Sequence, residues 1–176
     1  MPTIQKSPAP ENAQLHKYTS MPGAYTDSYL TEIPIQVSFS DYVFTFYTTP
    51  LFKVERLILK LFVRKPSTDK DARELADGVR AQFAAWTVEA RSENQILMCD
   101  FAGSTRSWLM TVPTETGTRL YFGSAVVPHR ISKEGKPSLG FFFTALLGFH
   151  KVYSVLLLHS AGAKLKHNRL MSTRRP

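Results

Sequence analysis

The sequence predicts an α+β domain in which an antiparallel meander sheet holds one long C-terminal helix. Four strand-like runs follow one another between residues 83 and 127, separated by short turn-forming clusters. A mostly apolar stretch, Leu139–Leu165, comes directly after them and is long enough for a helix. Because a long helix must bury its apolar face, the sheet just formed is the nearest surface on which it can pack.

Length and composition favour one domain. The chain has 176 residues, 43% of them hydrophobic, which is enough for a sizeable core, and it shows no internal repeat. Residues 1–22 are rich in Pro, Ser, Gln and Asn and are expected to be disordered. We expect the domain to span residues 23–166 and a flexible basic tail to follow at residues 167–176.

The charge of the chain indicates the kind of partner to expect, and its cysteine content indicates the compartment. Twenty-two basic against fourteen acidic residues leave a formal charge of +8, which favours a membrane surface, nucleic acid or an acidic ligand. The single cysteine, Cys99, excludes an internal disulfide, and no secretory signal precedes the domain, so we expect a cytoplasmic protein. No nucleic-acid-binding motif accompanies the basic residues near the C-terminus, which we expect to be solvated: Lys164, Lys166, Arg169, Arg174 and Arg175.

The first elements are one strand and two helices. Tyr25–Glu32 predicts an edge strand closed by Pro34. Ser40 is expected to cap a short helix that runs to Thr48, with Asp41 in its first turn.

An amphipathic helix is predicted next, over Leu51–Arg64. Its apolar side carries Val54, Ile58 and Leu61, and a basic stripe runs along the opposite side, comprising Lys53, Arg56, Lys60 and Arg64. Ser67 or Thr68 then caps a third helix within residues 69–80, loosened near Gly78. Peripheral contact of the basic stripe with an anionic membrane stays open.

Period-two patterning begins after these helices. In the first strand Trp86, Val88 and Ala90 alternate with polar neighbours, which predicts one core-facing side. The turns fall at residues 92–94, 102–103 and 113–117, and the predicted strands are Phe83–Arg91, Gln95–Phe101, Ser104–Val112 and Thr118–Val127.

The terminal helix has one apolar stripe for the sheet. Tyr153 and Leu157 lie beside this stripe, which comprises Phe142, Ala145, Phe149, Val152 and Leu156. The pair His150-Lys151 in mid-segment disfavours a membrane span, because a central Lys costs about 2.5 to 3.5 kcal/mol on insertion.

The order of elements resembles the START-like or helix-grip superfamily of polyketide cyclases, pollen allergens and lipid-transfer domains. The phrases YTDSYL, YTTPLFKVERLILKLF, FAAWTVEARSENQILMCD, STRSWL, GTRLYFGSAVVP and FHKVYSVLLLHS are also similar to an uncharacterised bacterial family within or near it. The resemblance implies a pocket between sheet and terminal helix that takes a hydrophobic small molecule or lipid. Its wall would comprise Trp86, Leu97, Trp108, Leu109, Phe122, Phe142, Phe149, Tyr153 and Leu156.

Polar residues within the strands are the candidates for chemistry. A charged side chain that turned inward from a strand would indicate a site, and the candidates are Glu89, Asp100, Arg106 and Arg119. Asp100 and Arg106 flank one hairpin and are positioned to pair across it. A cyclase- or dehydratase-like enzyme is therefore an alternative, with Asp100 or His129 as acid or base and Arg106 stabilising negative charge.

Metal and cofactor signatures are lacking. His150 and His159 stand too far apart on the helix to share a metal, and we expect no metal and no cofactor. Cys99 reads as a small core residue. Three functions thus stay open: a hydrophobic-ligand binder, which we prefer, the enzyme, and a peripheral membrane or protein-interaction module.

Overall fold

A computed structural model of the chain describes residues 3–58, 61, 64, 66–127, 130–131, 137–138 and 141–172. At residues 58, 130–131, 137–138, 141–152, 170 and 172 the backbone alone is described. The predictions for His129 and for the side chains of Phe142, Ala145, Phe149 and Val152 therefore lie outside the described part.

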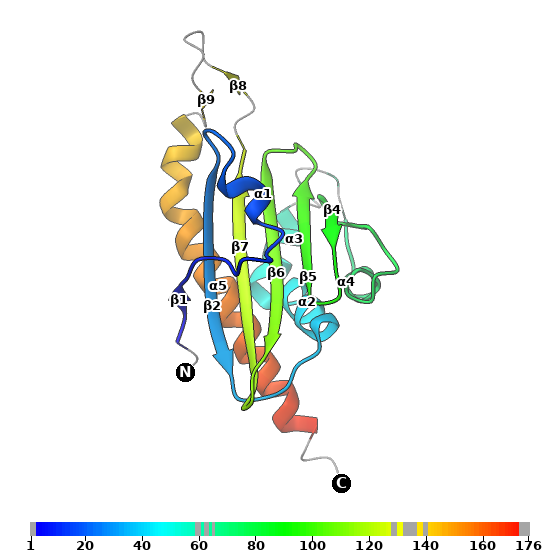
Figure 1. Cartoon of the computed structure of the whole chain (residues 1–176). Helices are drawn as coiled ribbons and strands as arrows, with labels where there is room; N and C mark the ends of the chain where they lie inside the picture. The colour runs from blue at the N-terminus through cyan, green and yellow to red at the C-terminus, as the bar shows by residue number, and fades with distance from the viewer. Residues whose placement is uncertain are drawn as a thin grey trace.

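A seven-stranded antiparallel sheet forms the centre of the molecule, in the order β1-β2-β7-β6-β5-β4-β3 (Figure 1). The α+β class and the meander are confirmed, and two-residue strands extend the predicted five to seven. β2 is not a bare edge strand, because it pairs with β7 along its whole length and with β1 on its other side. The strands are β1 (Gln5–Lys6), β2 (Tyr25–Ile33), β3 (Gln82–Phe83), β4 (Trp86–Arg91), β5 (Gln95–Asp100), β6 (Thr105–Pro113) and β7 (Thr118–Val126), with a separate small hairpin of β8 (Arg130–Ile131) and β9 (Pro137–Ser138).

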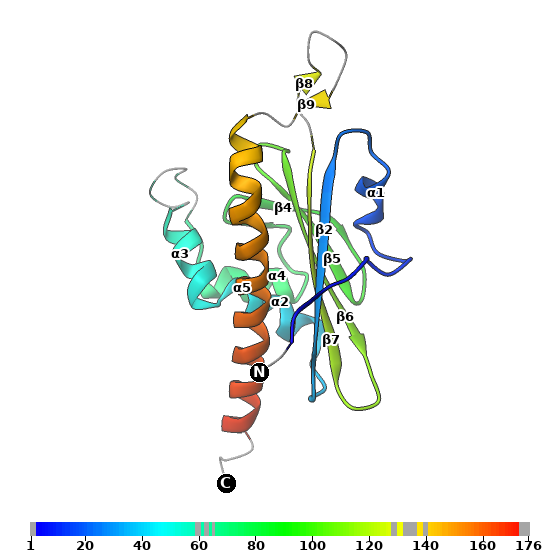
Figure 2. The same cartoon turned by 90° about the vertical axis from the view of Figure 1, so that its left-hand side faces the viewer.

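The longer helices cover one face of this sheet (Figure 2). Three of them lie in the crossover from β2 to β3, and the long terminal helix runs along β2 and β7. The helices are α1 (His16–Thr19), α2 (Phe39–Tyr47), α3 (Pro50–Ile58), α4 (Asp69–Ala76) and α5 (Phe141–Ser172).

Helix α2 begins two residues earlier than predicted. Its cap is Ser38, whose Oγ accepts a hydrogen bond from the backbone N–H of Asp41 at 3.1 Å. Ser40 lies inside the helix and donates to Asp77 at 2.5 Å. The cap position requires extended backbone, which Ser38 has. For α4 the predicted cap Thr68 is confirmed, in a reciprocal capping box with Asp71.

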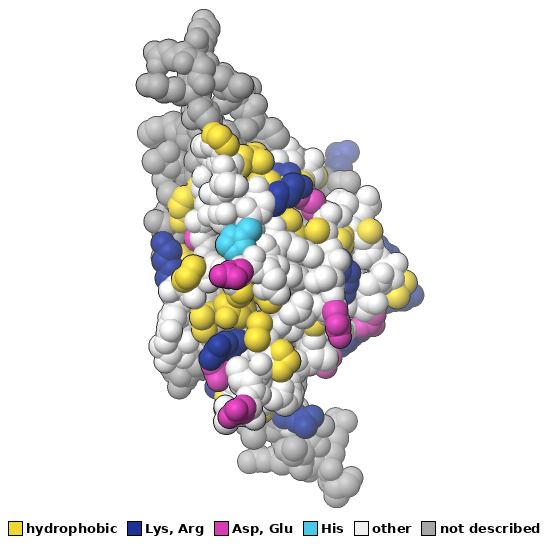
Figure 3. Space-filling view, in the orientation of Figure 1, with side chains coloured by type: hydrophobic (Ala, Val, Ile, Leu, Met, Phe, Trp, Pro, Cys, Tyr) yellow, Lys and Arg dark blue, Asp and Glu magenta, His cyan; other side chains and the backbone are white. Residues whose placement is uncertain are grey.

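The N-terminal segment packs against the other face of the sheet and is not the disordered lead-in that its composition predicts. Leu15 and Tyr18 are buried against Trp108, in a second core with Ala13, Leu97, Met110, Tyr121 and Ala125. Gly123 permits this approach, because a Cβ there would come within 2.9 Å of both Leu15 and Trp108. Figure 3 shows this face, where basic and acidic side chains are interspersed. A few well-placed apolar residues thus anchor a segment whose average composition is polar.

Strand β4 contains a bulge that changes which residues face the helices. Trp86 and Val88 pack on the helix-facing core as predicted, but the register shifts between Val88 and Ala90. Ala90 consequently packs on the outer core, and Arg91 turns back to donate to the last carbonyls of α4, at 2.7 Å to Leu75. The extra residue of the bulge is Glu89.

Of the predicted α5 stripe, Leu156 alone has a described side chain, and its predicted burial is wrong, whereas Leu157, predicted beside the stripe, is buried. Leu157, Leu158, Ala161 and Leu165 are buried against the sheet, whereas Leu156 is 50% exposed. Lys164, expected to be solvated, donates to the carbonyl oxygen of Thr48 at 2.8 Å, and burial lowers its pKa. The helix continues through Ser172, so residues 167–172 of the predicted tail are helical. Among the described residues, no helix combines the length and the apolarity that a membrane span needs.

Candidate functional site

A row of polar residues crosses the helix-facing side of the sheet. Asp27 of β2 lies beside Ser124 of β7, which lies beside Ser107 of β6. All three are at most 8% exposed. The next row on the same face is apolar and comprises Tyr29, Phe122, Leu109 and Ile96. The interior therefore changes from apolar to polar along the strands.

Asp27 is the centre of the first half of this row. Ser124 donates its hydroxyl to Asp27, and the hydroxyls of Tyr25 and Tyr29 lie 3.4 Å from the other carboxylate oxygen. Burial, with Asp27 adding to it, raises the pKa of both tyrosines to about 12. Both phenols are therefore protonated donors at neutral pH.

A second buried carboxyl comes from the helix layer. Glu55 of α3 points inward and accepts a hydrogen bond from the Tyr153 hydroxyl of α5, with Trp86 of β4 as a further hydrogen-bonding side chain. Burial raises the pKa of Glu55, against these hydrogen bonds, which lower it. Burial and the neighbouring Glu55 raise the pKa of Tyr153 as well. Glu55 thus takes up a proton more readily than an exposed glutamate does.

Tyr47 of α2 lies near both Glu55 and Ser107. Its side chain is 1% exposed, and its hydroxyl has no hydrogen-bond partner among the described residues. Burial raises its pKa; Ser107 is near enough to lower it, and Glu55 near enough to raise it further. The polar cluster, as we use the term, comprises Asp27, Tyr47, Glu55, Ser107, Ser124 and Tyr153.

An unpaired hydroxyl in a protein interior is costly, by about 1 to 3 kcal/mol. Tyr42 shows the contrast within the same helix, since it is 0% exposed and its hydroxyl donates to the Tyr121 carbonyl at 3.0 Å. Phe52 and Phe83 flank the Tyr47 ring, with centroids at 4.9 and 5.2 Å. The Tyr47 hydroxyl therefore emerges from a packed aromatic core beside groups that accept and donate hydrogen bonds.

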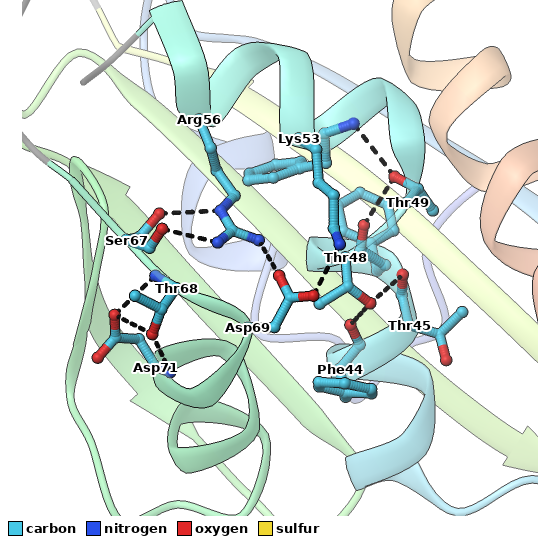
Figure 4. A network of polar contacts seen from close by, with 12 residues as sticks. Phe44, Thr45, Thr48, Thr49, Lys53, Arg56, Ser67, Thr68, Asp69 and Asp71 are labelled. Atoms are coloured by element: carbon cyan, nitrogen blue, oxygen red, sulfur yellow. Dashed lines mark hydrogen bonds and ion pairs between the residues drawn. The ribbon is translucent and has the colours of Figure 1, made fainter. Parts of the chain in front are cut away.

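Helix α3 is held in place by the ion pairs of Arg56 and Lys53 (Figure 4). Arg56 is only 9% exposed and donates to Ser67 Oγ at 3.0 Å, to the Ser67 carbonyl at 2.7 Å and to Asp69 at 2.6 Å. Lys53 bonds the second oxygen of Asp69 at 2.7 Å. Of the predicted basic stripe, Arg56 is therefore buried, whereas Lys53 and Arg64 are exposed. The contacts of Arg56 and Lys53 with Asp69 orient the adjacent Glu55 toward the interior.

The predicted ligand-wall residues divide between the two faces of the sheet. Trp86, Leu109, Phe122 and Tyr153 pack on the helix-facing core. Leu97 and Trp108 belong to the outer core, because side chains alternate along a strand, so they cannot share a wall with Leu109. Leu156 is exposed, and Phe142 and Phe149 lie outside the described side chains.

The predicted catalytic residues do not come together. Asp100 accepts the backbone N–H of Ser104 at 2.8 Å in the β5–β6 turn, and it does not pair with Arg106. Arg106 instead binds Glu89 at 2.9 Å and the Tyr18 hydroxyl at 2.8 Å on the outer face. Arg106 lies opposite Cys99 in the register, so Asp100, the next residue of β5, points to the other face of the sheet, and Arg106 pairs with Glu89 on the outer face instead.

This outer network fastens the N-terminal segment to the sheet. Burial alone would raise the pKa of Glu89, but hydrogen bonds from Lys17, Tyr18 and Arg106 outweigh it and hold the pKa below its ordinary value. Lys17 reaches the carboxylate at 2.6 Å. We call Lys17, Tyr18, Glu89 and Arg106 the N-terminal latch. Its polar groups are paired with one another, which is the pattern of a structural tie.

The remaining candidates are peripheral. Arg119 forms a half-exposed pair with Glu32 at 3.0 Å. Cys99 is partly buried and burial raises the pKa of its thiol, which disfavours a nucleophilic thiolate. Across the described part of the chain, no three His, Cys, Asp or Glu residues gather as a metal site would require.

Fold and cluster define the class of protein: an α+β domain with polar groups buried between a curved sheet and its helix layer. Comparison of the chain with protein-family models produces no match, and no curated protein is significantly similar to it. The site is therefore argued from its own residues.

Sequence reasoning missed Tyr47, Glu55 and Asp27, the members of the cluster that matter most. Glu55 is the only acidic residue among residues 50–66, which carry five basic residues and are otherwise mostly apolar. Asp27 interrupts a strand run, YTDSYL. Isolated acids in apolar runs were thus the available signal. Tyr47 had none, because its missing partner is a property of the folded chain.

Proposed function

We propose that the polar cluster is one wall of a binding site for a small amphipathic molecule. The observation that carries this proposal is the buried Tyr47 hydroxyl without a partner. A ligand that accepts a hydrogen bond from Tyr47 removes the cost of the unpaired donor, so binding and folding both gain from it. The apolar part of the ligand would lie against Trp86 and Phe122, which face the same core.

The charges of the cluster favour a neutral polar group on the ligand. Asp27 and Glu55 are both carboxyls, and the cluster as defined contains no lysine or arginine. Arg91 is near enough to Tyr47 to lower its pKa, but it donates its hydrogen bonds to the Leu75 and Ala76 carbonyls, so an anionic headgroup would meet two acids at the cluster. A hydroxyl, ketone or ester fits better, held by Tyr47 as a donor. The preferred ligand is thus a lipophilic molecule with a neutral oxygen function.

Native mass spectrometry of freshly purified protein tests the proposal directly. We expect the wild-type protein to carry a lipophilic adduct, which Tyr47→Phe and Glu55→Gln reduce strongly. Glu89→Gln is the matched control, because it removes a partly buried carboxylate from the outer face and leaves the cluster intact. A wild-type protein without an adduct, or an adduct that both cluster variants retain, would contradict the proposal.

Acid–base catalysis is a second candidate, favoured by Glu55. A glutamate whose pKa is raised by burial donates a proton more readily at a given pH than an exposed glutamate that is already ionised, and Tyr153 is placed to stabilise the carboxylate that remains. The molecule identified by mass spectrometry would then change mass on prolonged incubation with wild-type protein. Recovery of the same molecule unchanged, from both wild type and Glu55→Gln, would leave binding as the function.

A further inference from the structure

Helix α3 and Leu61, which follows its end, present apolar side chains to solvent. Val54, Leu57 and Leu61 are 56%, 54% and 64% exposed, and they make up three of the seven exposed large hydrophobic residues of the described part. The sequence predicts Val54 and Leu61, with Ile58, as the apolar side of this helix, and that side is exposed at Val54 and Leu61. Arg56 explains why these side chains face solvent. Its guanidinium is bonded to Ser67 and Asp69, and these bonds hold the Arg56 side of α3 toward the protein and leave the side with Val54 and Leu57 outward.

The charges around these side chains are positive. Residues 50–66 contain five basic residues and a single acid, Glu55, which is turned into the interior. Lys53, which precedes Val54 in the helix, is exposed, and so is Arg64 beyond the end of the helix. Asp69, the carboxylate nearest to Lys53, is shared between Lys53 and Arg56, so this corner keeps an excess of positive charge.

The position of α3 makes this surface accessible. Of the helices that cover the sheet, α3 lies farthest from it, on the outside of the helix layer (Figure 2). By contrast, on the face seen in Figure 3 basic and acidic side chains are interspersed. We define the α3 surface as Lys53, Val54, Leu57, Leu61 and Arg64.

We propose that the α3 surface binds the surface of an anionic lipid bilayer, with Leu57 and Leu61 inserted at the level of the headgroups. Bare leucines flanked by cations suit such an interface, where apolar insertion and attraction to acidic headgroups add together. The positive charge of the α3 surface is complementary to the anionic headgroups of phosphatidylserine or phosphatidylglycerol. A neutral apolar partner would leave this charge unmatched. This inference does not depend on a ligand in the interior, since it uses residues on the opposite side of α3.

Vesicle sedimentation tests it, with phosphatidylcholine vesicles that contain or lack phosphatidylserine, at physiological salt. We expect wild-type protein to bind the anionic vesicles and to bind neutral ones far less. The double variant Leu57→Ser/Leu61→Ser should lower the partition coefficient about tenfold, because it removes the insertion of two leucines. Raising the salt should also weaken binding, since each exposed cation near the surface contributes roughly fivefold.

The matched control is Val79→Ser/Phe101→Ser, which removes two equally exposed hydrophobic residues elsewhere on the molecule. This variant should bind like the wild type, and circular dichroism establishes that both variants are folded. Wild-type protein that stays in the supernatant with anionic vesicles would overturn the inference. Dimerisation in analytical ultracentrifugation that the α3 variant abolishes would also overturn it, because a second copy of the chain would then cover the surface.

Discussion

Tyr→Phe substitutions at Tyr42 and Tyr47 measure what a buried tyrosine hydroxyl contributes to stability in two different surroundings. We expect the two changes in stability to have opposite signs. Both side chains come from α2, both are at most 1% exposed, and both belong to the helix-facing core. The Tyr42 hydroxyl is bonded to the Tyr121 carbonyl at 3.0 Å, whereas that of Tyr47 is unpaired in the described structure. Tyr→Phe removes the same atom in each case, and only its surroundings differ.

We expect Tyr47→Phe to stabilise the ligand-free protein by about 1 to 3 kcal/mol, because it removes a buried donor that lost its water on folding. For a domain of this size, that corresponds to a rise in Tm of roughly 2 to 12 °C. Tyr42→Phe should instead destabilise the protein by about 0.5 to 1.5 kcal/mol, the net value of one hydrogen bond.

The assay is urea unfolding of protein first refolded from denaturant, so that any co-purified molecule is absent. Adding back that molecule should reverse the order, because wild type gains binding energy that Tyr47→Phe lacks. If Tyr47→Phe costs as much stability as Tyr42→Phe, the Tyr47 hydroxyl is paired in the folded protein, and the argument for the binding site fails.

Three further predictions concern pH, the N-terminal latch and α5. Burial raises the pKa of Glu55. The stabilisation linked to its protonation is therefore present below the unfolded pKa of about 4.3 and is lost as pH rises through the folded pKa. In pH-dependent melts, wild type should lose stability relative to Glu55→Gln over that range. Glu89→Gln should speed amide hydrogen exchange in residues 13–19, an effect absent if the latch is not what fastens this segment. Leu158→Ala should cost about 2 to 5 kcal/mol in denaturant melts and Leu156→Ala less than about 0.5 kcal/mol, and equal costs would show that the helix stripe is wrongly assigned.

The fold follows from local patterns to a large extent. Period-two runs predict β4 to β7 within a few residues, and their short turns predict the meander. Failures occur where one residue changes the register of the rest. The bulge at Glu89 moves Ala90 to the outer core. Separately, the register that places Cys99 opposite Arg106 turns Asp100 to the other face of the sheet. A pattern of alternating residues contains no signal for such a bulge, because its cause is the pairing with β5.

The site was less predictable than the fold, because each of its members depends on a long-range contact. Glu55 points inward because Arg56 binds Asp69, thirteen residues later. Tyr47 has no hydrogen-bond partner among the described residues because α2 packs its hydroxyl into a core that distant strands form. The burial of Leu156 in α5 was wrongly predicted for a related reason: a nearly all-apolar helix has no single face that hydrophobicity selects, and the sheet decides that Leu157 and Leu158 are covered while Leu156 is not.

Helix α3 connects the two proposals. The contacts of Arg56 and Lys53 with Asp69 fix its rotation, and this rotation has two consequences at once. It places the carboxyl of Glu55 in the interior, next to Tyr153, and it leaves Leu57 exposed on the outer side. Asp69→Asn would weaken both ion pairs, so it should disturb the adduct and the binding of anionic vesicles together, whereas Tyr47→Phe should affect the adduct alone. A result in which Asp69→Asn changes neither would show that the ion pairs do not set the rotation of α3.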